Sequence, residues 1–116
     1  MKHMHFDQVP RQPVTVAGAE RVAVRWLIAQ DDGAPNFAMR RFELEPGGRT
    51  PHHIHAWEHE VYVLEGRGTV RCEGEEAEFQ AGDFLYIAPG EEHCFVAGSD
   101  GAVAFLCLIP HPAPEN

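Results

Sequence analysis

Turn-forming residues interrupt this chain so often that long helices have no room. The sequence holds 11 glycines and 9 prolines in 116 residues, and no window longer than about ten residues escapes a Gly, Pro, Asp or Asn break. The segments between the breaks are rich in β-branched and aromatic residues, which favour strands. The pattern predicts an all-β chain with regular turns, which closes best as a small barrel or jelly roll.

Eight segments have the strand pattern, and turn-forming clusters such as "EPGG", "EGRG" and "AGD" lie between them. The predicted strands are residues 21–28, 37–45, 59–65, 68–73, 77–80, 83–88, 93–97 and 102–109. A chain of this length builds one hydrophobic core, so we expect residues 1–116 to form a single domain. Within it, residues 1–18 are expected to form an extended N-terminal arm and residues 110–116 a C-terminal tail.

Charge, apolar run length and cysteine spacing together argue against several classes of function. Eighteen acidic residues against nine basic ones give a net charge of -9, whereas nucleic-acid binding needs clustered Lys and Arg. The longest apolar run, residues 102–109, is too short to cross a bilayer, and no signal pattern opens the chain. Three widely spaced cysteines indicate reduced thiols. We expect a cytoplasmic protein without a nucleic-acid or membrane partner.

Histidines are crowded into one short segment, "HHIHAWEH" at residues 52–59. Because side chains alternate along a strand, His53, His55 and His59 would share a face with Val61 and Val63. The valines favour an inward face, where imidazoles are costly to desolvate unless their nitrogens find partners. A transition-metal ion is one such partner. The alternative is a set of histidines that is exposed or satisfied within the core.

Three further residues bear on this candidate metal site. His93 follows the turn "APGEE" and could supply a fourth imidazole. His52 has the opposite parity and is expected to face outward, although a slip of one residue would exchange it with His53. Glu60 is a rival to His59 as a ligand.

Arg40 is the one charged residue on the predicted core face of its strand, which also carries Ala38, Phe42 and Leu44. A buried guanidinium needs either a protein carboxylate or a bound anion as its partner. Both alternatives remain open from the sequence.

The histidine segment resembles the first motif of the cupin superfamily, G-x5-H-x-H-x3-4-E-x6-G. Gly47, His53, His55 and Gly66 have the required spacing, but His59 stands where the common motif has Glu. The second motif, G-x5-P-x-G-x2-H-x3-N, is matched more loosely. Gly82, Gly90 and His93 fit it, whereas Ala88 replaces the proline and Ala97 the final asparagine.

The phrases "APNFAMRRFELEPGG", "WEHEVYVLEG" and "FLCLIP" resemble more closely the small bacterial manganese cupins that have an all-histidine site. The resemblance spans about residues 20–110. It implies a double-stranded β-helix barrel and a homodimer. It also implies one divalent ion, manganese first and otherwise Fe, Ni, Cu or Zn, with these ligands: His53, His55, His59 and His93.

Such a site would leave coordination positions open for a substrate, as catalysis requires. Four neutral ligands also leave the charge of the ion uncompensated, which favours an anionic or enolate-like small molecule. We therefore expect a metal-dependent, dioxygenase-like oxidoreductase, with Arg40 as the anchor of an acidic group and Phe105 and Cys107 as pocket walls. The alternative is a cupin module that binds a metal and a small ligand without catalysis.

Overall fold

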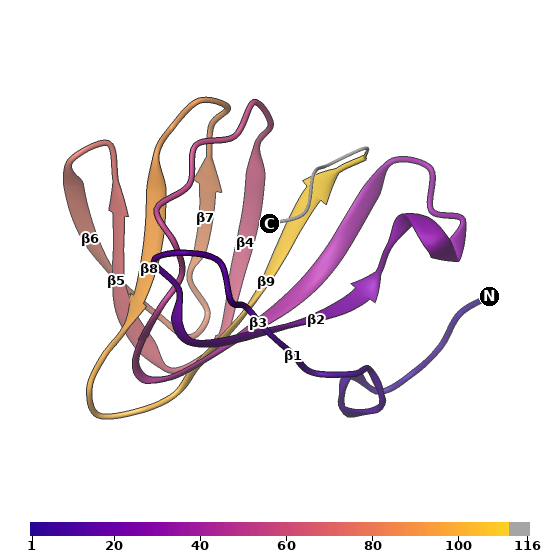
Figure 1. The fold of residues 1–116 in the computed structure, drawn as a ribbon, viewed down its shortest axis with the longest axis horizontal. Coiled ribbons are helices and arrows are strands. Elements are labelled where there is room, and N and C mark those ends of the chain that lie inside the picture. The colour runs from indigo at the N-terminus through magenta and orange to yellow at the C-terminus, as the bar shows by residue number, and fades with distance from the viewer. Residues whose placement is uncertain (112–116) are drawn as a thin grey trace.

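The protein folds into a curled sheet with two facing layers in a computed structural model, which describes residues 1–111 (Figure 1). The strands are β1 (Gln12–Pro13), β2 (Glu20–Ile28), β3 (Phe37–Arg49), β4 (His59–Glu65), β5 (Arg67–Cys72), β6 (Glu75–Gln80), β7 (Phe84–Ile87), β8 (His93–Ala97) and β9 (Val103–Pro110). Two 3-10 turns, η1 (Phe6–Gln8) and η2 (Gln30–Asp32), complete the described elements. The predicted all-β jelly roll is confirmed.

The strands are ordered β6-β5-β8-β3-β9-β4-β7, with β2 paired to β3 and β1 to β2. β6, β5 and β8 form one layer, and β2, β3, β9, β4 and β7 form the other (Figure 1). The long strand β3 joins the two layers, because its last residue, Arg49, pairs with Val96 of β8.

β9 lies between β3 and β4 and pairs with both in antiparallel register. Cys107 is opposite Arg40 on one side and Val61 on the other, and Phe105 is opposite Phe42 and Val63. Paired residues point to the same face of a sheet. Inward side chains of these strands therefore build the core with residues from the other layer, such as Val70, Phe79 and Phe95.

The segment before β4 differs from the sequence-based expectation. The parity prediction treated residues 53–63 as one strand, but β4 begins at His59 and His53 forms only an isolated bridge with His93. Both backbone hydrogen bonds of that bridge are present, at 3.0 and 2.9 Å. Residues 54–58 then leave the ladder, so a loop and not a strand face positions His53 and His55.

The N-terminal arm is built onto the sheet edge. Within it, Gln12 pairs with Val24 and Pro13 with Ala23, which makes β1 an additional edge strand. The preceding turn η1 places Phe6 over Arg41, with the guanidinium carbon 3.9 Å from the ring centroid. Residues 112–116 of the expected C-terminal tail lie outside the described residues.

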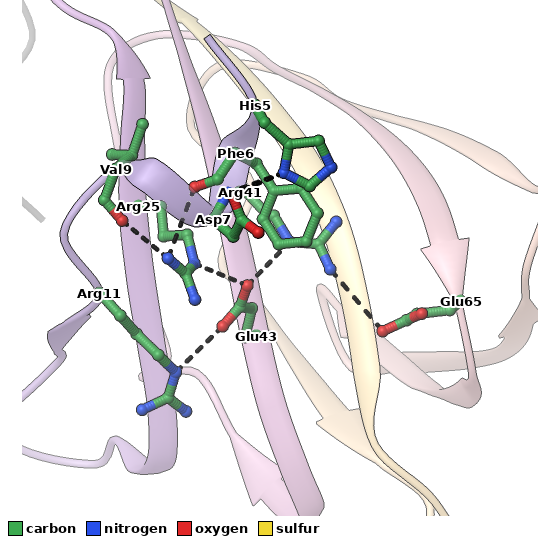
Figure 2. A network of polar contacts seen from close by, with 9 residues as sticks. All are labelled: His5, Phe6, Asp7, Val9, Arg11, Arg25, Arg41, Glu43 and Glu65. Carbon is green, nitrogen blue, oxygen red and sulfur yellow. Dashed lines mark hydrogen bonds and ion pairs between the residues drawn. The ribbon is translucent and has the colours of Figure 1, made fainter.

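Glu43 on the outer face of β3 binds three arginines from three parts of the chain (Figure 2). Its carboxylate accepts bonds from the Nε atoms of Arg11, Arg25 and Arg41 at 3.0, 2.9 and 2.8 Å. Burial by itself would raise the pKa of Glu43, but these three bonds outweigh it and hold the pKa below its ordinary value of 4.5.

Several large apolar side chains are exposed on the outer face of β4 and β7, among them Tyr62, Phe84 and Tyr86. The homodimer expected from the sequence stays a prediction. None of the helical turns among the described residues is long and apolar enough to span a membrane. The cytoplasmic location also stays a prediction.

We predict that Glu43→Gln lowers the free energy of unfolding by about 2 kcal/mol at pH 7, because a charged acceptor of several hydrogen bonds is lost. The folded-state pKa lies below the unfolded one, so this stabilisation is present above pH 4.5 and is lost as the pH falls through the folded-state pKa. Urea unfolding of both proteins at several pH values measures the difference.

Glu65→Gln is the matched control for this prediction. Glu65 is 64% exposed and lies 3.7 Å from Arg41, so its loss should change stability by less than about 0.5 kcal/mol. The difference in unfolding free energy between wild type and Glu43→Gln should shrink below pH 4.5. If it does not, the charge of Glu43 is not the source of the stabilisation.

Candidate metal centre

A cavity of about 320 Å³ lies between the two layers, and its walls come from four parts of the fold. β2 and β3 contribute apolar and aromatic side chains, and β9 contributes Phe105 and Cys107. The loop after β3 and the starts of β4 and β8 contribute the histidines, and residues 12–16 of the arm form the remaining side. No Asp or Glu is found among the described residues that line the cavity.

All four histidines expected as ligands line this cavity: His53, His55, His59 and His93. Their rings form a continuous chain, with centroid separations of 4.9 Å between His53 and His55, 5.3 Å between His55 and His59, and 4.6 Å between His59 and His93. His59 and His93 are buried, whereas His53 and His55 are partly exposed. The fold thus gathers imidazoles from a loop and two strands at one end of the pocket.

Burial keeps these imidazoles neutral. Desolvation first, and then repulsion from His93 and Arg40, lowers the pKa of His59 to about 3. Desolvation, followed by repulsion from His53, His93 and Arg40, lowers the pKa of His55 to about 4. The pKa values of His53 and His93 are lowered chiefly by burial as well. Neutral imidazole is the form that binds metal ions.

The hydrogen bonds of the rings bear on how they could hold an ion. His93 Nδ1 lies 3.0 Å from the carbonyl oxygen of Glu91, and a proton on Nδ1 there leaves the lone pair on Nε2. His59 Nδ1 is buried and has no hydrogen-bond partner within the described residues. His55 Nε2 and His53 Nδ1 lie 3.1 Å apart and bond to each other.

The rings of the described residues are not arranged as a finished coordination sphere. Across residues 1–111, no group of three or more His, Cys, Asp or Glu side chains has the geometry of a metal site. The donor chemistry nevertheless fits a borderline transition metal, since four neutral nitrogens lie together and one buried nitrogen has no partner. Binding by all four rings would exchange the bond between His53 and His55 for two bonds to the ion.

Arg40 is buried, with 4% of its surface exposed, and lines the same cavity. It takes part in none of the ion pairs among residues 1–111, and its Nε has no hydrogen-bond partner. Nη2 donates to Cys107 Sγ at 3.1 Å, and the guanidinium carbon lies 4.8 Å from the Phe42 ring and 5.4 Å from the Trp26 ring. Of the two partners left open by the sequence, a protein carboxylate is therefore absent in the described chain.

Phe105 and Cys107 line the cavity beside Arg40. Burial raises the pKa of the Cys107 thiol, and the nearby guanidinium opposes that effect only in part. The thiol is thus a buried hydrogen-bond acceptor for Arg40 and not an ionised nucleophile.

His52 and Glu60 do not line the cavity. His52 is exposed, and its Nε2 lies 3.3 Å from Cys94 Sγ on the other side of the loop. Glu60 is exposed on the outer face of β4 beside Tyr86. The placement of His59 inside and Glu60 outside therefore favours His59 as the candidate ligand.

Contributors to the site that sequence reasoning missed include Thr50 and residues 12–16 of the arm, and Trp57 also contacts the histidines. Trp57 stacks on His55, with ring centroids 4.3 Å apart and planes inclined by 15°. Thr50 lines the cavity while its hydroxyl accepts a bond from the Phe95 N–H at 2.8 Å. Residues 12–16 close one side, and the alternating "PVTV" before the first predicted strand was the only signal for them.

Comparison with known proteins places this pocket in a family. Residues 40–109, more than half of the chain, match the family described as the Cupin_2 cupin domain. The chain belongs to the cupin family. The match is to the cupin domain in general, so the closer resemblance to four-histidine manganese cupins stays a prediction.

The polyketide cyclase RemF from Streptomyces resistomycificus is similar over nearly the whole of this cupin. The two are 38% identical, with a TM-score of 0.92 over 99% of this chain and 82% of that one. A predicted oxalate decarboxylase from Thermotoga maritima, 20% identical, shares the fold with a TM-score of 0.83 over 94% of this chain and 98% of that one.

A curated relative, 1-methylthio-D-xylulose 5-phosphate methylsulfurylase from Rhodospirillum rubrum, is 32% identical over 71 residues. That match covers 61% of this cupin but only 46% of the relative. The chain therefore spans less than half the length of that protein.

We predict that His59→Ala and His53→Ala each weaken binding of Mn²⁺ at least about 100-fold, because loss of a direct ligand costs no less than loss of a supporting partner. His52→Ala is the control, because this neighbouring imidazole lies outside the cavity. Titration of the metal-free proteins, followed by elemental analysis, gives the affinities. Equal binding by all three variants would refute the assigned ligands.

Proposed function

We propose that this cupin is a metal-dependent enzyme that closes a ring within a small, enolisable and anionic polycarbonyl substrate. One observation carries the proposal: four neutral imidazoles lie beside an Arg40 that has no carboxylate partner among the described residues, inside a cavity with aromatic walls. A neutral nitrogen set and a spare guanidinium together favour oxygen-rich, negatively charged ligands.

The similar proteins support this substrate class. The name of RemF describes action on a polyketide, and the name of the curated relative describes a phosphorylated ketose. Both compounds present carbonyl oxygens, and the second is an anion. The ion that we propose is manganese, with iron as the second choice, because of the sequence resemblance.

Bound to the four histidines, such an ion would supply Lewis-acid polarisation of substrate oxygens. Arg40 would hold a carboxylate or enolate oxygen of the substrate through its guanidinium group, which lines the cavity. Trp26, Phe42 and Phe105 would hold the apolar part of the substrate in a folded conformation.

The reaction is redox-neutral. The carbon between two carbonyl groups loses a proton to solvent, and the resulting enolate carbon attacks another carbonyl carbon of the same molecule. One carbon–carbon bond forms, the carbonyl π bond breaks, and the new alkoxide takes a proton from solvent. Subsequent loss of water leaves the unsaturated ring. No co-reactant is consumed.

The dioxygenase-like activity expected from the sequence is the second candidate. It is favoured by the lack of a carboxylate base among the described pocket residues, because chemistry centred on a redox-active ion needs no such base. The two candidates share their substrate class and differ in whether oxygen is consumed. A cupin that only binds its ligand would neither close a ring nor consume oxygen.

We predict that the manganese-loaded protein converts a linear triketo acid into a cyclic product under argon at the same rate as in air. Mass spectrometry of the product and an oxygen electrode measure the reaction. Dependence on oxygen, with stoichiometric uptake, would replace the cyclase by the oxygenase. Binding of the triketo acid without turnover in either atmosphere would favour the non-catalytic module.

A separate prediction concerns Arg40→Met. This variant should bind a β-keto acid about 10- to 100-fold more weakly, because a charged hydrogen bond is lost, and its methyl ester with little change. Folding stability should be unchanged or higher, because the change removes a buried charge that has no carboxylate partner among residues 1–111. Calorimetric titration and urea unfolding give the two quantities. A destabilised variant that binds both compounds equally would assign Arg40 a structural role.

A further inference from the structure

The N-terminal arm passes from one face of the sheet to the other. Phe6 and Arg11 contact the outer face, where they meet Arg25, Arg41 and Glu43 (Figure 2). Residues 12–16 line the cavity on the inner face. The neighbouring side chains of β2 and β3 that point inward, such as Val24 and Phe42, line the same cavity. The arm therefore wraps around the edge strand β2.

The part of the arm that lines the cavity has little packing of its own. Of residues 12–16, only Val14 is partly buried, and the other four are exposed. β1 has two residues, one of them the proline Pro13, which has no N–H to donate. A further backbone bond runs from the Val14 N–H to the Val22 carbonyl at 3.0 Å. Such a segment opens locally at small cost in free energy.

The outer part of the arm is held by what we call the latch, formed by Phe6 and Arg11 on the arm with Arg25, Arg41 and Glu43 on the sheet (Figure 2). The Phe6 ring lies 3.9 Å from the guanidinium carbon of Arg41 and 5.4 Å from that of Arg25. Arg25 Nη1 also donates to the Val9 carbonyl at 2.7 Å, and Val9 is buried.

We propose that the arm is the gate of the pocket: residues 12–16 form a removable wall, and the latch on the opposite face of the sheet sets how often that wall opens. The latch on the outer face then controls access to the histidines and to Arg40 on the inner face. The inference goes beyond the proposed function, because it concerns how a ligand reaches this pocket and not the reaction that takes place there.

Cys107 reports on the opening without any turnover. Its Sγ accepts a hydrogen bond from Arg40, the residue lines the cavity, and only 3% of its surface is exposed. Cys94 is equally hidden, with 1% exposed, but lies outside the cavity against His52. The rate at which iodoacetamide alkylates each thiol in the full chain, followed by peptide mass spectrometry, therefore compares opening of the pocket with opening of the whole fold.

We expect Phe6→Ala to raise the alkylation rate of Cys107 roughly fivefold, because contacts of Phe6 with two guanidinium groups are lost. Arg11→Gln breaks a partly exposed ion pair and should raise it about twofold. In the double variant, the alkylation rate of Cys107 should rise roughly tenfold. The alkylation rate of Cys94 should stay unchanged in each variant. Glu65→Gln is the control, because Glu65 contacts Arg41 but not the arm.

Three results would overturn the gate. If Cys107 reacts at the wild-type rate in the double variant, the latch does not control the wall. If Cys94 accelerates in parallel with Cys107, the arm opens only when the whole barrel unfolds, and no separate gate exists. An acceleration of Cys107 in Glu65→Gln equal to that in Phe6→Ala would likewise assign the effect to Arg41 and not to the arm.

Discussion

The pairing of β9 between β3 and β4 is the constraint on which the pocket depends. β9 is apolar on both faces, so it has to lie in the middle of a sheet that is covered on its inner side. Its register places Cys107 in one row with Arg40 and Val61, and Phe105 in the next row with Phe42 and Val63. A slip of β9 by one residue would turn Cys107 and Phe105 to the opposite face.

This register also fixes an unusual charge distribution. The chain carries a net charge of -9, yet the described lining of its pocket contains an arginine and four neutral histidines without a carboxylate. Surface acids act at long range only weakly, because salt screens charges beyond about 8 Å at physiological ionic strength. Within the pocket, the guanidinium is the dominant charge, and no carboxylate in the described part of the chain offsets its desolvation. The arrangement is understandable when a ligand supplies that anion.

Much of the sheet could be predicted because each strand carries its own signal. The alternation of Ala38, Arg40, Phe42 and Leu44 marked the buried face of β3 correctly, and the two-sided apolar run marked β9 as central. The positions of His53 and His55 are different, because they depend on a loop that is held by bonds to His93 and Gly90. Such contacts join distant parts of the chain, and periodicity carries no information about them.

The order of the N-terminal arm could not be predicted for the same reason. Its composition, rich in proline and polar residues, indicates a frayed segment, and nothing local contradicts that interpretation. Its order comes from partners far away in the sequence, since Arg25 binds Val9 across 16 residues and Arg11 meets Glu43 across 32. Long-range ion pairs of this kind become visible only when the register of β2 and β3 is known.

Arg40 and Arg41 show how strand geometry, and not residue type, assigns a role. The two residues are adjacent in β3 and point to opposite faces. Arg41 meets Glu43 and Phe6 outside, so its charge is compensated and contributes to holding the arm. Arg40 meets Trp26, Phe42 and a neutral thiol inside, so its charge is available to a ligand. One strand thus anchors the arm on one face and binds the proposed substrate on the other. A change in the pairing of β2 with β3 would therefore alter both the access to the pocket and its affinity for anions.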